Sequence, residues 1–233
     1  MESLSVSFPV RIIIKQRSFH DDNDSQCRLA EHDVRRFRSG DYYGSHSLYD
    51  LWESWMTPFM ELISILGKGG IFLIILSLIL LFFRRTRRFG TAMAIGFALG
   101  AIGVNVWLKV VIARPRPYAD VNGFYYPLWV LLGSHTESDF SFPSGHTNAA
   151  FATMIPVFVL GRKNWSWLAV FFGILMGISR IYLVVHYPSD VIGGMITGTI
   201  AGLIGVFITR CIPSRSKWYS WSLFRSRAKG AHL

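Results

Sequence analysis

Long apolar stretches constrain the fold of this chain more than any other feature. The sequence of 233 residues is 51% hydrophobic and only 16% charged, whereas soluble domains carry about 25% charged residues. A helix needs about 20 apolar residues to cross a bilayer. Stretches near this length occupy residues 62–83, 90–112, 145–160, 165–185 and 191–208. We predict an all-α fold, a polytopic membrane helix bundle with about five transmembrane helices.

The regions that flank these stretches divide the chain further. Residues 1–50 are polar, and they lack the apolar stretch and cleavage site of a signal peptide. Residues 51–60 carry Trp52 and Trp55, which predicts an N-terminal interfacial helix with its tryptophans at headgroup level. The expected parts are a polar segment of uncertain structure (1–50), a membrane domain (51–212) and a basic cytoplasmic tail (213–233).

The formal net charge of +10 raises the question of nucleic-acid binding. The basic residues cluster instead at the ends of alternate spans, at 84–88, at Arg162 and Lys163, and after residue 209. This pattern is typical of cytoplasmic loops. We predict a multi-pass membrane protein with a cytoplasmic C-terminus, and we expect the membrane to be a bacterial inner membrane. We predict no nucleic-acid partner. The lipid bilayer is its expected partner, and the opposite ends of the spans face the extracytoplasmic side.

Cations stand at that opposite end of the spans. Lys109 is the only charged residue within 90–112, and Arg180 is the only one within 165–185. Arg116 follows Lys109 by seven residues, about 10 Å along a helix and on nearly the same face. Ionisable residues inside a membrane are costly and need a partner. Because the spans carry no matching acidic residues at this level, we expect a bound phosphate as the counter-anion.

A turn with free backbone donors opens the stretch 145–160. Its 16 residues reach only roughly 24 Å as a helix, so we expect it to begin below the membrane surface. Ser144 is a good N-cap, and Gly145 lets an anion approach the backbone N–H groups of the first turn. The sequence thus places His146 in a recessed anion site.

His186 and Asp190 flank Pro188 at the start of the last span. Asp190 is near enough to His186 to accept a hydrogen bond from one ring nitrogen, which makes the other nitrogen the better nucleophile. Two histidines and a carboxylate are also zinc ligands. Three surrounding cations would repel a divalent ion, so we predict no metal and no cofactor.

These residues resemble the signature of the type 2 phosphatidic acid phosphatase superfamily. Its pattern is Lys, six residues, Arg-Pro; then Pro-Ser-Gly-His; then Ser-Arg, five residues, His, three residues, Asp. The chain matches with Lys109 to Pro117, with Pro143 to His146, and with Ser179 to Asp190. The similarity covers about residues 60–210. Membrane members have one more span before the equivalent of 62–83, for which residues 1–50 show no apolar stretch.

The resemblance implies a metal-independent lipid phosphatase. In that reading His186 attacks phosphorus and forms a phosphohistidine, Asp190 holds its ring, and His146 protonates the leaving oxygen. The implied phosphate-binding residues are Lys109, Arg116, Ser144, Gly145 and Arg180. The implied substrates are undecaprenyl diphosphate, phosphatidylglycerophosphate or phosphatidate.

Several alternatives remain open at this point. The enzyme could hydrolyse a water-soluble ester, or the chain could be a non-catalytic lipid-headgroup binding or transport protein. The presence of His146, His186 and Asp190 favours an enzyme. Arg114 lies beside Arg116. It could contact a second phosphate, a headgroup or simply the membrane interface, and we favour the interface. The loop 117–142 is either a substrate-selecting element or a solvated connector. The oligomeric state does not follow from the sequence.

Overall fold

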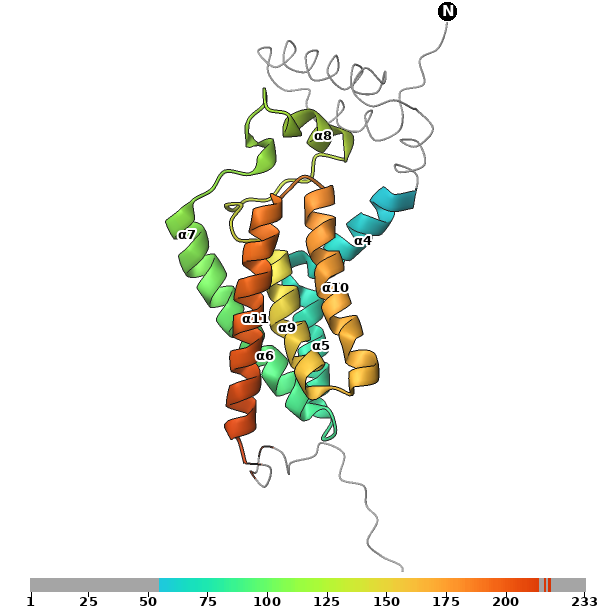
Figure 1. Cartoon of the computed structure of the whole chain (residues 1–233), viewed down its shortest axis with the longest axis vertical. Helices are drawn as coiled ribbons and strands as arrows, with labels where there is room; N and C mark the ends of the chain where they lie inside the picture. Colours follow the sequence, from blue (N-terminus) through green and yellow to red (C-terminus); the bar gives the residue numbers. More distant parts are fainter. Residues whose placement is uncertain (1–54, 214–215, 217, 219–233) are drawn as a thin grey trace, which may run out of the picture.

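The computed structural model describes residues 55–213, 216 and 218, and this part of the chain is helical throughout, without a strand (Figure 1). The expected all-α membrane bundle is therefore confirmed. Four helical stretches are long and apolar enough to cross a membrane: Thr57–Phe82, Arg87–Ile112, Lys163–Tyr182 and Pro188–Cys211. The third predicted span is the shorter helix Gly145–Leu160. The segment 1–50 and the start of the predicted interfacial helix lie outside the described residues.

The helices follow one another with short breaks. The elements are α4 (Thr57–Gly67), η3 (Lys68–Gly70), α5 (Ile71–Phe82), α6 (Arg87–Ala101), η4 (Ile102–Leu108), α7 (Lys109–Ile112), η5 (Pro117–Ala119), α8 (Tyr125–Leu131), α9 (Gly145–Leu160), α10 (Lys163–Tyr182) and α11 (Pro188–Cys211). The element η4 is a π-helical stretch, and η3 and η5 are 3₁₀ turns.

Helix α9 forms the centre of the bundle, in contact with α4, α5, α6, α10 and α11. Every residue from Thr147 to Pro156 on it is buried. A helix buried on all sides needs no charged face, which explains why α9 carries no Asp, Glu, Lys or Arg. Figure 1 shows that α9 begins below the upper ends of α10 and α11. Its first residue, Gly145, is recessed within the bundle, as its length predicted.

Glycines let α11 lie directly against the backbone of α9. A Cβ atom added at Gly194 would lie 2.6 Å from the carbonyl oxygen of Ser144, and one at Gly198 would lie 2.5 Å from that of Asn148. On α6, a Cβ at Gly96 would lie 2.5 Å from the carbonyl oxygen of Ala152. Small residues one turn apart permit such close approach in lipid. The four-residue spacing of Gly194 and Gly198 in the sequence is typical of such close packing, which the structure shows.

The first span is kinked in its middle. Gly69 and Gly70 have φ values of 60° and 68°, a backbone conformation that glycine adopts at little cost. Helix α4 therefore leans away from the axis of α5 (Figure 1). The described part of the predicted interfacial helix 51–60 runs without a break into α4. The structure thus moves the break from residue 60 to the glycines at 69–70.

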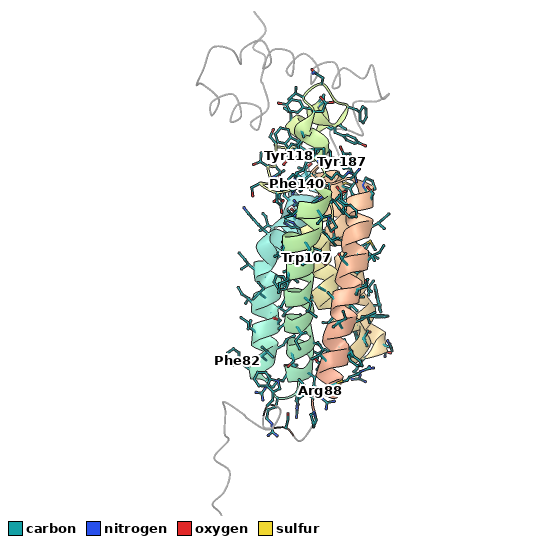
Figure 2. The ribbon with its side chains drawn as sticks, turned by 90° about the vertical axis from the view of Figure 1, so that its left-hand side faces the viewer. Phe82, Arg88, Trp107, Tyr118, Phe140 and Tyr187 are labelled. Carbon is teal, nitrogen blue, oxygen red and sulfur yellow. The ribbon has the colours of Figure 1, made fainter. Side chains whose placement is uncertain are left out.

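The basic loops and the predicted site occupy opposite ends of the bundle. Figure 2 shows Phe82 and Arg88 at one end and Tyr118, Phe140 and Tyr187 at the other. At the basic end Arg87 is buried and closes the end of α5, because its Nε donates to the carbonyl oxygen of Leu81 at 2.7 Å. The three predicted site segments all meet at the other end.

Candidate active site

A polar cavity lies at the recessed start of α9. Its volume is about 170 Å³. Of the predicted site residues, Lys109, Arg116, Gly145, His146 and His186 line it. They come from α7, from the loop after it, from the first turn of α9 and from the connection between α10 and α11. The fold therefore brings together residues that are separated by up to 77 positions in the sequence.

The ring of His186 is buried between a cation and a carboxylate. Its Nε2 lies 3.4 Å from Nη1 of Arg116. A guanidinium has only donors, so Nε2 is the nitrogen that carries the lone pair. Its Nδ1 lies 3.5 Å from Oδ2 of Asp190, which is too long for a good hydrogen bond, and no other atom of the described residues bonds this nitrogen. The predicted pair is present, with the ring turned so that Nε2 faces the cavity residue Arg116.

Burial sets the protonation state of His186. Burial lowers the pKa of His186 to about 4. The positive charge of Arg116 also lowers this pKa, whereas Asp190 raises it and compensates only in part. The imidazole is therefore neutral at neutral pH, with its Nε2 lone pair available. A neutral ring is the form that a nucleophilic histidine requires.

Asp190 is held by groups that the sequence analysis did not assign to the site. Its Oδ1 accepts from Nη1 of Arg114 at 2.7 Å. Its Oδ2 accepts from Oγ of Ser141 at 2.5 Å and from the backbone N–H of Tyr187 at 2.9 Å. The carboxylate is fully buried. The prediction that Arg114 contacts only the interface is wrong, since its guanidinium pairs with Asp190 and lies 4.0 Å over the ring of Tyr187.

Arg114→Gln should lower kcat by about ten-fold, because Asp190 would lose its charged partner and hold His186 less firmly. KM should change little, since Arg114 does not line the cavity. Arg114→Lys, which keeps the charge, should recover part of kcat. Steady-state phosphate release with a lipid substrate provides the measurement. An unchanged kcat in Arg114→Gln would show that this ion pair has no positioning role.

The loop 117–142 supplies the counter-anions that the spans lack. Asp139 forms ion pairs with both Lys109 and Arg116, and Glu137 forms one with Arg180. Burial alone would raise the pKa of Asp139, but its hydrogen bond to Lys109 and the charges of Lys109 and Arg116 hold that pKa below its ordinary value. The expectation that a bound phosphate alone would neutralise these cations was therefore incomplete. A phosphate entering the cavity competes with two carboxylates of this loop for the same donors.

The first turn of α9 is built as predicted. Ser144 is the N-cap, and its Oγ accepts from the backbone N–H of Thr147 at 3.4 Å. A Cβ at Gly145 would lie 3.5 Å from Nζ of Lys109, so glycine leaves this approach open. The backbone N–H of Ser144 already donates to the carbonyl oxygen of Asp190 at 2.9 Å. Ser144 is fully buried and is not among the residues that line the cavity, so its phosphate contact stays a prediction.

Arg180 lies in an adjoining cavity. It donates to Ser64 and to Glu137, and it lines a second space of about 150 Å³ rather than the first. His146 and Glu137 line both cavities. Close packing against the glycine backbone of the kink positions His146, because a Cβ at Gly67 would lie 2.9 Å from its Cδ2. The predicted cations thus lie on two sides of His146.

Similar proteins place these residues in a wider context. The sequence matches the family described as the PAP2 superfamily over residues 85–216. An undecaprenyl-diphosphatase from Sulfolobus acidocaldarius is 33% identical over 155 residues, which cover 66% of this chain and 71% of that protein. A phosphatidylglycerophosphatase B from Bacillus subtilis is 32% identical over 161 residues, which cover 64% of this chain and 72% of that protein.

Solved structures share the fold. A crystal structure of a transmembrane phosphatidylglycerolphosphate phosphatase from Bacillus subtilis matches with a TM-score of 0.56 and 24% identity. The match covers 89% of this chain and 95% of that chain. The likeness therefore extends over nearly the whole helical bundle.

Proposed function

Because the chain belongs to the PAP2 superfamily of lipid phosphatases, we propose that it removes the terminal phosphate of a lipid phosphate or diphosphate through a phosphohistidine on His186. The observation that carries this proposal is the single recessed cavity that joins His186, His146, Lys109 and Arg116. Family membership establishes a hydrolase of the lipid phosphatase class. The covalent mechanism, the substrate and the sidedness are the proposed parts.

The first step transfers the phosphoryl group to the protein. The Nε2 lone pair of His186 attacks phosphorus, and the bond between phosphorus and the leaving oxygen breaks. The protonated ring of His146 gives its proton to that oxygen, so the lipid leaves as an alcohol or as a monophosphate. Nδ1–H of His186 faces Asp190 at 3.5 Å, and we expect this contact to shorten as the ring becomes positive. Lys109 and Arg116 neutralise the phosphoryl oxygens.

The second step returns His186 to its free state. Neutral His146 takes a proton from water, and the resulting hydroxide attacks the phosphohistidine. The bond between phosphorus and Nε2 breaks, and inorganic phosphate leaves. No redox change or further reactant is needed. The cation-rich cavity favours both steps by positioning and charge neutralisation, which dominate phosphoryl transfer.

The described residues also support a substrate that stays in the membrane. A largely apolar cavity of about 350 Å³ borders His186 from the other side. Leu128, Leu131 and Leu132 line it, with Ile181 and Val184 opposite. The space suits a hydrocarbon segment that is attached to a phosphate at His186. A water-soluble ester would leave this apolar wall exposed to water.

The charge distribution supports an extracytoplasmic site. Figure 2 shows Arg88 at the end opposite the cavity. The connections from α5 to α6, with Arg84 and Arg85, and from α9 to α10, with Arg162, lie at that same end (Figure 1). By the positive-inside tendency this end and the C-terminus face the cytoplasm. We propose a multi-pass membrane protein with residues 51–212 as its phosphatase domain, between the polar segment 1–50 and the basic tail 213–233.

Phosphate release from a panel of lipids tests the proposed function. The full chain, purified in detergent, should release phosphate from undecaprenyl diphosphate, phosphatidylglycerophosphate or phosphatidate, and a chelator should leave the rate unchanged. The part of the chain that the structure describes contains no cluster of three His, Cys, Asp or Glu side chains suited to a metal ion. Release from soluble esters alone would favour the soluble-ester alternative. A folded protein that binds these lipids without turnover would favour a headgroup-binding protein.

A further inference from the structure

Lys68 is a charged residue in the middle of a membrane-spanning helical stretch. It lies within Thr57–Phe82, at the kink between α4 and α5. A lysine at this depth is costly in lipid unless it faces a polar cavity or a partner. Among the described residues Lys68 has no ion-pair partner, in contrast to Lys109 and Arg180. The catalytic site proposed above does not use it.

The second cavity is where Lys68 meets the site. Lys68, Ser64, Arg180 and His146 line this space of about 150 Å³. Arg180 is only 2% exposed, and its Nε has no hydrogen-bond partner in the part of the chain that the structure describes. A buried guanidinium N–H without a partner carries a large desolvation cost. The cavity thus combines a free ammonium with an unused buried donor.

We propose that Lys68 forms a second phosphoryl subsite in the cavity that it shares with Arg180, and that this subsite receives the leaving phosphate of a lipid diphosphate. This inference rests on the proposed function and names its substrate class. His146 lines both cavities, so the bridging oxygen that it protonates lies between the two subsites. The terminal phosphoryl group then lies with His186, Lys109 and Arg116, and the leaving phosphoryl group lies with Lys68.

Charge balance supports this division. In the second cavity Glu137 pairs with Arg180, and Glu61 lies 3.0 Å from Nε2 of His135. Neither carboxylate is paired with Lys68, so among the described residues its ammonium is available to a new anion in that space. A monophosphate ester ends in an alcohol on the leaving side and makes no use of an ammonium there. A diphosphate carries two or more negative charges across both subsites. An ionic contact with Lys68 therefore strengthens the binding of a diphosphate but not that of a monophosphate.

Binding of two small anions tests the second subsite without any turnover. The probes are methylenediphosphonate, a diphosphate analogue with a carbon bridge, and orthophosphate, each titrated calorimetrically into the detergent-purified full chain. Lys68→Gln should lower the affinity for methylenediphosphonate by about ten-fold, because one charge-assisted contact is lost. The affinity for orthophosphate should fall by less than about two-fold. Lys68→Arg should retain most of the affinity. Lys163→Gln, an exposed lysine at the opposite end, is the matched control.

The same variants should show the effect in catalysis. In Lys68→Gln, kcat/KM should fall about ten-fold for a lipid diphosphate and hardly at all for a lipid monophosphate. The second subsite would be overturned by equal losses of affinity for the two anions or by equal losses of kcat/KM for the two lipids. An unchanged affinity or kcat/KM for the diphosphate would overturn it as well. Failure of the wild-type chain to hydrolyse any lipid would instead count against the proposed function, because the binding measurement does not depend on turnover.

Discussion

His186→Ala is expected to lower lipid phosphate hydrolysis by at least about 10⁴-fold while the protein remains folded. The reason is chemical: Nε2 of His186 lies 3.4 Å from Arg116 at the cavity wall, and the carboxylate of Asp190 lies beside the other ring nitrogen. The removed ring would leave water as the remaining nucleophile at the phosphorus atom. Phosphate release from the most active lipid of the panel gives the rate.

Two controls separate chemistry from folding in this variant. The thermal midpoint and the gel-filtration profile in detergent should match those of the unmodified protein. His146→Ala should still accept phosphate from the substrate, and rapid acid-free quenching with radiolabelled lipid should then trap a phosphoprotein. His186→Ala should show none. Turnover retained in His186→Ala within about ten-fold would remove His186 as the nucleophile and leave the PAP2 fold with another mechanism.

Gly198→Ala is expected to destabilise the bundle by about 2 to 3 kcal/mol, although alanine favours helices. Its Cβ would lie 2.5 Å from the carbonyl oxygen of Asn148 and 2.7 Å from Cβ of Phe151. Both atoms belong to the central helix α9 and cannot move aside as a flexible side-chain tip would. The thermal midpoint in detergent should fall by roughly 5 to 10 °C.

Gly103→Ala is the matched control for this packing prediction. Gly103 also lies in a helical stretch, and a Cβ there would meet no atom within 4 Å. Its thermal midpoint should be unchanged or higher, since the substitution changes only helix propensity. Equal midpoints for Gly198→Ala and Gly103→Ala would show that α11 can shift away from α9 at little cost. Activity should follow stability, because α11 also carries Asp190.

Much of this protein follows from the sequence because membrane helices are local patterns. The length and spacing of the apolar stretches predict the bundle, and the 16-residue length of α9 predicts its recessed start. The glycines at 194 and 198 predict close packing without any knowledge of the partner helix. The candidate residues Lys109, His146 and His186 stand out because charges and histidines are rare at the ends of apolar stretches.

The tertiary structure alone decided which groups stabilise those residues. Arg114 reaches Asp190 across 76 positions, and sequence spacing contains no information about such a pair. The acids Asp139 and Glu137 lie in a loop, where carboxylates are common and usually solvated, so their pairing with the cations was not predictable. Lys68 lies next to the kink at Gly69 and Gly70 and lines the cavity that Arg180 also lines, which its position in an apolar stretch did not indicate.

The physical reason for this division is the range of the interactions involved. Helix formation and membrane insertion depend on neighbours within a few turns, and the order of residues records them. Ion pairs such as Arg114–Asp190 form only after the helices have packed, when side chains distant in sequence lie within 4 Å of each other. The sequence therefore determined the helices and the reactive side chains. The packed bundle decided how those side chains are oriented, paired and divided between two cavities.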